Sequence, residues 1–102
     1  MIRHISIFFI KEEKKSKLPE LLEVLEKCTK EVDEVGFMTG ANCMPGPDEK
    51  IPGLPEFGDL VQVIDFADRT EAEQYPTHPA HQKLMQEIGD AVEKVVAIDV
   101  EG

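Results

Sequence analysis

Three segments of the chain are rich in β-branched and aromatic residues, and each is largely apolar on both of its alternating sides. They cover residues 2–10 (IRHISIFFI), 60–66 (LVQVIDF) and 95–101 (VVAIDVE). Successive side chains of a strand point to opposite faces of its sheet. A sheet with one wet face should therefore alternate between apolar and polar residues, and these segments do not. We expect them to form a sheet that is covered on both faces.

Two other segments have the periodicity of amphipathic helices. Residues 18–32 place leucine, cysteine and valine on one stripe, with Ser16 as the expected N-cap and Pro19 in the tolerant first turn. A short helix is expected from Asp68 or Thr70, each of which has a glutamate three residues later, to about residue 75. The helix restarts after Pro76, with an apolar stripe at residues 80 or 81, 84, 85, 88 and 92.

The remaining segments complete a recognisable order. Residues 35–43 form a weaker strand, loosened by two glycines, and residues 44–58 form a loop with four prolines and three glycines. The chain then reads β-α-β-β-α-β over a single domain, residues 1–102. This order predicts an α+β protein, a ferredoxin-like sandwich with an antiparallel four-stranded sheet and its helices on one face.

Helices on one face leave the other face of the sheet bare. That face would be an exposed apolar patch larger than monomers normally carry. The simplest cover is a second copy of the chain, related by a two-fold axis. We therefore predict a homodimer formed through the sheet faces.

Charge and cysteine content narrow the class of protein. The chain has 21 acidic and 11 basic residues and a net charge of -10, which argues against nucleic acid or an anionic membrane as partner. No apolar run approaches the roughly 20 residues that span a bilayer. The first residues lead directly into a strand and do not resemble a signal peptide. With only two cysteines and no framework spacing, we expect a cytoplasmic protein with reduced thiols.

One short motif stands out between the two halves of the broken helix. Tyr75 is followed after two residues by His78-Pro79-Ala80-His81. Together with the opening Ile2-Arg3-His4 and the closing VVAIDVE, this motif resembles the stress-responsive A/B-barrel domain (Dabb) family over essentially the whole chain. The resemblance implies a ferredoxin-like protomer whose sheet pairs with that of a second copy in a dimeric α/β barrel.

The same resemblance implies candidate site residues. Most members of the family have no assigned chemistry, but a plant branch includes polyketide cyclases. In that branch the tyrosine and the second histidine of the motif look like an acid/base pair, and by motif position these are Tyr75 and His81. The early histidine of the family corresponds to His4.

The residues themselves leave several roles open. His81 shares a helical face with Met85 and Ile88, so it is either a hydrogen-bonded core histidine or a general acid/base near neutrality. Tyr75 either packs with a wet hydroxyl or donates to a substrate carbonyl. His78 is expected to cap the helix that starts at Pro79.

A ligand site is expected where polar residues meet in an apolar setting. His4, Gln62 and His81 would form such a cluster if they share the helix-covered face, and we expect His4, Gln62 and His78 to bind the ligand. A three-histidine metal site is the weaker alternative because His78 should turn outward, so no metal or other cofactor is expected. Three functions stay open: a protein that binds a small apolar molecule, a cyclase-like proton-transfer enzyme using His81 and Tyr75, and a structural or stress-protective oligomer.

Overall fold

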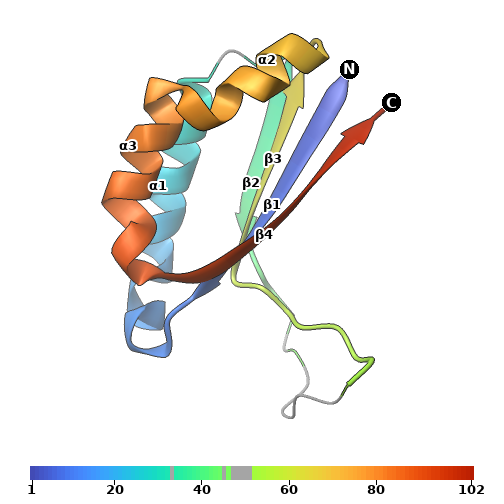
Figure 1. The fold of residues 1–102 in the computed structure, drawn as a ribbon. Helices are drawn as coiled ribbons and strands as arrows, with labels where there is room; N and C mark the ends of the chain where they lie inside the picture. The colour runs from blue at the N-terminus through green and yellow to red at the C-terminus, as the bar shows by residue number, and fades with distance from the viewer. Residues whose placement is uncertain (33, 45, 47–51) are drawn as a thin grey trace.

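A computed structural model describes residues 1–32, 34–44, 46 and 52–102. Its four strands form one antiparallel sheet in the order β2-β3-β1-β4, with β1 in the interior and β4 at an edge (Figure 1). The strands are β1 (Ile2–Ile10), β2 (Gly36–Ala41), β3 (Leu60–Phe66) and β4 (Val92–Glu101). The β-α-β-β-α-β order expected from the sequence is present.

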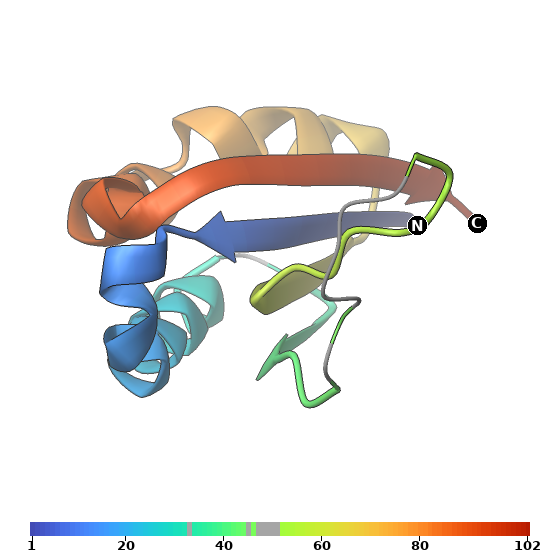
Figure 2. The same cartoon turned by 90° about the horizontal axis from the view of Figure 1, so that it is seen from below.

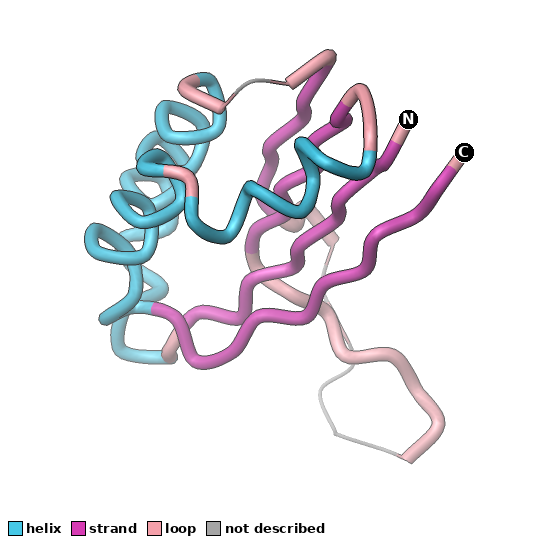
Figure 3. The backbone as a smooth tube through the Cα atoms, turned by 45° about the horizontal axis from the view of Figure 1, so that its top comes forward, coloured by secondary structure: helices cyan, strands magenta, loops and turns pink. Residues whose placement is uncertain are grey.

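The helices lie on one side of the sheet (Figure 3). They are α1 (Leu18–Lys30), α2 (Arg69–Gln74) and α3 (Pro79–Ile88), joined by the 3₁₀ turns η1 (Glu12–Lys17), η2 (Tyr75–Thr77) and η3 (Gly89–Ala91). Figure 2 shows the same layering from below, with β4 as a long strand along the edge. Both chain ends lie at the same end of the sheet, where the Gly102 amide donates to the Met1 carbonyl at 3.1 Å.

Two sequence-based boundaries were wrong. Ser16 does not cap α1, because the charged stretch before it forms η1 and the N-cap is Lys17, whose side chain makes no capping bond. Val92 does not continue the stripe of α3, because η3 reverses the chain and Val92 pairs with Ile10 in the sheet. The expected cap at Asp68 is confirmed, since its carboxylate accepts a hydrogen bond from the Glu71 amide at 2.9 Å.

The core between helices and sheet consists of two apolar clusters. One is centred on β1, α1 and α3 and contains Phe8, Leu25 and Leu84, and the other contains Ile64, Phe66 and Tyr75. Three buried polar residues accompany them: Ser6, Thr29 and Gln62. Ser6 and Gln62 are direct partners in the β1–β3 register, so a polar layer crosses the middle of the core.

Among the residues that the structure describes, no helix covers the opposite face of the sheet (Figure 1). We call it the open face, and the register assigns to it the apolar side chains of Ile5, Ile7, Phe9, Met38, Val61, Val63, Val96, Ile98 and Val100. Large apolar residues in it are exposed, with Ile98 at 59%. The prediction that both sheet faces are apolar is confirmed.

The loop that leads into β3 is tied to the end of β1. The Asp59 carboxylate accepts a hydrogen bond from the Ile10 amide at 2.8 Å, and the Asp59 amide donates to the Phe8 carbonyl at 2.9 Å. The expected loop over residues 44–58 lies partly outside the described residues, which leave out 45 and 47–51.

Candidate functional site

Tyr75 stands at the centre of the cluster that the sequence indicated. It occupies η2, in the break between α2 and α3, where Pro76 and Pro79 prevent one continuous helix. Its buried ring lies 4.8 Å from the His81 ring in an edge-on arrangement and 5.5 Å from the His4 ring, measured between centroids. Both histidines therefore contact the same aromatic ring.

His81 is half-buried in the first turn of α3. Burial lowers its pKa from the ordinary 6.5, a hydrogen bond with the backbone of Pro76 acts in the opposite direction, and nearby His4 lowers the pKa further. Because proline has no N–H, the Pro76 carbonyl must be the acceptor of that bond. His81 is therefore a neutral imidazole at neutral pH, with one ring nitrogen donating and the other carrying a lone pair.

His4 is held at both of its ring nitrogens. Nδ1 lies 2.7 Å from the Asp99 carboxylate on β4, and Nε2 lies 2.8 Å from the Ser6 hydroxyl. Asp99 is the direct partner of His4 in the β1–β4 register, and Ser6 is two residues along the same strand. A carboxylate only accepts, so Nδ1 carries a proton whether His4 is neutral or charged.

A second hydrogen-bond chain runs through the polar layer of the core. Thr29 Oγ1 donates to the Leu25 carbonyl at 2.6 Å and accepts from Gln62 Nε2 at 2.8 Å. The other end of the Gln62 amide, Oε1, accepts from the Tyr75 hydroxyl at 3.2 Å. Burial raises the pKa of the Tyr75 phenol, so the hydroxyl stays protonated across the physiological range.

The structure thus brings four of the five predicted site residues together: His4, Gln62, Tyr75 and His81. His78 serves as the N-cap of α3, as predicted, because its Nδ1 accepts the Ala80 amide at 3.0 Å. Sequence reasoning did not foresee Ser6, Thr29 or Asp99 as partners in this network. Strand alternation could have indicated Ser6, which shares a face with His4, whereas Asp99 depends on the pairing register.

Beside this cluster, the edge of the helix-covered face is open. By register, Val95, Ala97 and Asp99 of β4 lie on the same face as Phe8, Ser6 and His4, yet all three are exposed. Their counterparts on β1 are buried or half-buried. We call Val95, Ala97 and Asp99 the exposed strip; it gives solvent access along β4 next to His4.

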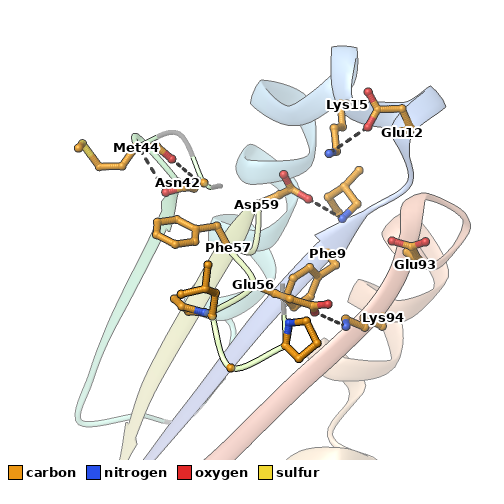
Figure 4. Close-up of a pocket in the computed structure, with 16 residues that line it drawn as sticks. Phe9, Glu12, Lys15, Asn42, Met44, Glu56, Phe57, Asp59, Glu93 and Lys94 are labelled. Carbon is orange, nitrogen blue, oxygen red and sulfur yellow. Dashed lines mark hydrogen bonds and ion pairs between the residues drawn. The ribbon is translucent and has the colours of Figure 1, made fainter. Parts of the chain in front are cut away.

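A separate cleft of about 1080 Å³ lies at the other end of β1, between the loop and the sheet (Figure 4). Its lysines are already paired, Lys94 with Glu56 at 2.6 Å and Lys15 with Glu12 at 3.1 Å, and Lys94 also lies over the Phe9 ring. The described lining contains neither histidine nor tyrosine. His4, His81 and Tyr75 therefore lie at the Tyr75 cluster and not in this cleft.

No group of three or more histidine, cysteine, aspartate or glutamate side chains among the residues that the structure describes is arranged to hold a metal ion. None of the described helices combines the length and the apolar character needed to cross a bilayer.

The architecture defines the chain as an α+β protein of the ferredoxin-like type with a two-histidine cluster beside its edge strand. A family model for the stress responsive A/B barrel domain (Dabb) matches residues 2–102, and the chain belongs to this family. None of the curated proteins matches it.

Solved structures show the same fold at low sequence identity. A dimeric ferredoxin-like protein of unknown function from Thermobifida fusca superposes with a TM-score of 0.76 at 19% identity, covering 99% of this chain and 90% of that one. A Dabb family protein from Mesorhizobium loti gives 0.72 at 22%, covering 99% and 95%. A protein described as an antibiotic biosynthesis monooxygenase gives 0.71 at 14%, covering 100% and 98%. At these identities the likeness shows the fold alone.

Proposed function

We propose that the protein forms a homodimer through its open faces and binds a small apolar molecule between the helices and the sheet. The dimer is supported by the bare apolar sheet face and by the dimeric state of the similar Thermobifida fusca protein. A two-fold arrangement places the same face of each copy against the other, which removes both patches from water.

The observation that carries the binding proposal is the exposed strip beside a half-buried histidine pair. An apolar surface with a few fixed polar groups is the usual composition of a small-molecule site. Val95 and Ala97 provide apolar surface, while His4 and His81, which both lie against the Tyr75 ring, supply polar atoms. With a net charge of -10, the chain favours a neutral or cationic ligand over an anion.

A ligand titration tests this site directly. Amide resonances of the ¹⁵N-labelled protein are followed while 2-nonanone is added, and we expect saturable shifts at residues 95–99 and at His81. Ala97→Phe should abolish them by filling the strip without removing a histidine. Gln86→Phe adds the same ring to the outer, exposed side of α3 and should leave them unchanged. Saturable binding that survives Ala97→Phe would show that the ligand lies elsewhere.

The second candidate function is proton-transfer catalysis on an apolar carbonyl compound, in which His81 acts as base and Tyr75 acts as donor after its hydroxyl leaves the Gln62 acceptor that it has in this structure. This catalytic function is favoured by the neutral state of His81, since a base must be unprotonated to accept a proton. A purely structural oligomer is the remaining alternative. A His81→Ala variant that stays folded and dimeric but loses 2-nonanone binding would exclude that alternative.

A further inference from the structure

Residues 52–58, which lead toward β3, lie on the open-face side of the sheet, away from the helices (Figure 1). We call this segment the arm. Two contacts join it to the open face. Glu56 pairs at 2.6 Å with Lys94, which the β1–β4 register places on that face. Gly58 lies so close to Ile7 of the same face that a Cβ at residue 58 would overlap its γ2-methyl. The arm therefore rises from one end of the open face.

The root of the arm is held by hydrogen bonds. Asp59 is bonded to the Phe8 carbonyl and the Ile10 amide, and its own carbonyl accepts the Asn42 amide at 2.9 Å. The Asn42 side chain in turn donates to the Met44 carbonyl at 2.7 Å and accepts the Met44 amide at 3.2 Å (Figure 4). The direction in which the arm leaves the sheet is thus set by bonds to β1 and to the end of β2.

The arm carries exposed apolar side chains. Leu54 is 51% exposed and Phe57 is 46% exposed. The backbone at Gly46 lies against Phe57, since a Cβ added at Gly46 would stand 3.0 Å from the Phe57 Cβ. Scattered single apolar residues are ordinary on a protein surface, but these two lie beside a face that is already apolar. The arm continues the apolar surface of the open face beyond the strands.

The arm does not lie flat on the sheet, because the cleft of about 1080 Å³ separates them. Its floor includes Phe9 and Lys94 of the open face, and its wall includes Leu54 and Phe57 of the arm (Figure 4). Two sheets packed face to face are about 10 Å apart. The arm consequently projects into the layer that a second copy would occupy on the open face.

We propose that the arm is part of the subunit interface, where Leu54 and Phe57 of each copy pack against the other copy. This contact rests on the proposed homodimer and goes beyond it, because it adds a segment outside the sheet to the interface. A two-fold axis makes the contact reciprocal, so that each copy contributes one arm. Burial of apolar strand faces alone is non-directional. An arm fixed at one end of the face defines how the two copies line up, and its fixed root lowers the ordering cost of association.

The first test detects the contact in the unmodified protein. Equal amounts of ¹³C-labelled and unlabelled protein are left to exchange subunits, and isotope-filtered NOEs between the two copies are recorded. We expect such NOEs from the methyl groups of Leu54 and the ring of Phe57, as well as from Ile98 on the open face. Leu22, on α1 across the sheet, is the control and should give none.

The outcomes separate the arm from the dimer. NOEs between copies from Ile98 but none from Leu54 or Phe57 would overturn the arm contact and leave the homodimer standing. A protein that sediments as a single subunit and gives no NOE between copies would overturn the homodimer, and the arm contact with it.

The second test measures the strength of the contact by sedimentation. Leu54→Asp places a carboxylate in a dry contact and should raise the dimer dissociation constant about tenfold or more. Val35→Asp adds the same charge at an exposed valine outside the arm and the open face, and should change the constant by less than about threefold. Amide spectra check that both variants are folded. An equal constant for Leu54→Asp and wild type would overturn the proposal, and should Leu54→Asp fail to fold, the NOEs of the unmodified protein decide.

Discussion

The Tyr75 hydroxyl donates a hydrogen bond to Gln62 Oε1 at 3.2 Å. Gln62 is only 1% exposed, so this bond lies inside the core. The amide of Gln62 continues through Thr29 to the backbone of α1. One side chain of β3 thereby joins the break between α2 and α3 to the first helix. The same bonds fix the position of the Tyr75 ring, which lies against both histidines.

Gln62→Leu should lower the free energy of unfolding by about 1–3 kcal/mol, because the Tyr75 hydroxyl loses its acceptor while it remains buried. Adding Tyr75→Phe should recover part of that loss, since the orphaned hydroxyl is removed with it. The two single variants and the double variant form a thermodynamic cycle, measured by urea unfolding at one protein concentration. Strictly additive losses would mean that the bond contributes nothing to stability.

A charge on the open face should prevent association. Ile98 is the most exposed large apolar residue of that face, and Ile98→Asp would place a carboxylate in a dry interface. We expect the variant to sediment as a single subunit at micromolar concentration and to keep its fold, because Ile98 is not part of the core. Val35→Asp makes the same change at an exposed valine outside the open face and should remain dimeric. A dimer that tolerates Ile98→Asp would place the interface elsewhere.

Gly58 is expected to tolerate no side chain while Ile7 keeps its present position. A Cβ at residue 58 would overlap the γ2-methyl of Ile7 and would lie 3.5 Å from the Phe8 carbonyl oxygen. Gly58→Ala should therefore cost about 1–3 kcal/mol in the free energy of unfolding, as overpacking usually does. Nothing lies within 4 Å of a Cβ at Gly89, so Gly89→Ala serves as the matched control and should change stability much less.

A second variant identifies the cause of the Gly58 effect. Ile7→Leu removes the methyl group on Cβ that the new side chain would meet, so Gly58→Ala should be less costly in the Ile7→Leu background. An equal cost in both backgrounds would attribute the loss to the backbone near Phe8.

The sequence was sufficient for the fold and for part of the site. The sequence predicted a cluster of His4, Gln62 and His81 only on the condition that all three face the helices. The pairing of Ser6 with Gln62 in the register places Gln62 on the same face as His4. Asp99 could not be found as the partner of His4 in the same way, because the pairing of residue 4 with residue 99 depends on the register between two distant strands. A shift of one residue in that register would place Asp99 on the other face.

For a related reason, the sequence could not show which group accepts the proton of the Tyr75 hydroxyl. The sequence suggests a tyrosine that donates to a ligand, and only the position of Thr29 on α1, at hydrogen-bond distance from Gln62, shows that the proton is already used. The start of the first helix was also misjudged, because a serine among charged residues resembles an N-cap, whereas η1 extends through it. Such errors arise where a local signal competes with contacts made by residues far along the chain.

The lowered pKa of His81 predicts how stability depends on pH. Burial disfavours its charged form in the folded state, so the unfolded chain binds the proton more tightly. The contribution of neutral His81 is therefore complete above its unfolded pKa of about 6.5 and is lost as the pH falls through that value toward the folded pKa. We expect the unfolding free energy of the wild type to decline as the pH falls below about 6.5, and that of His81→Gln to decline less over the same interval. Parallel pH profiles for wild type and His81→Gln would mean that His81 titrates alike in both states and is not held neutral by its surroundings.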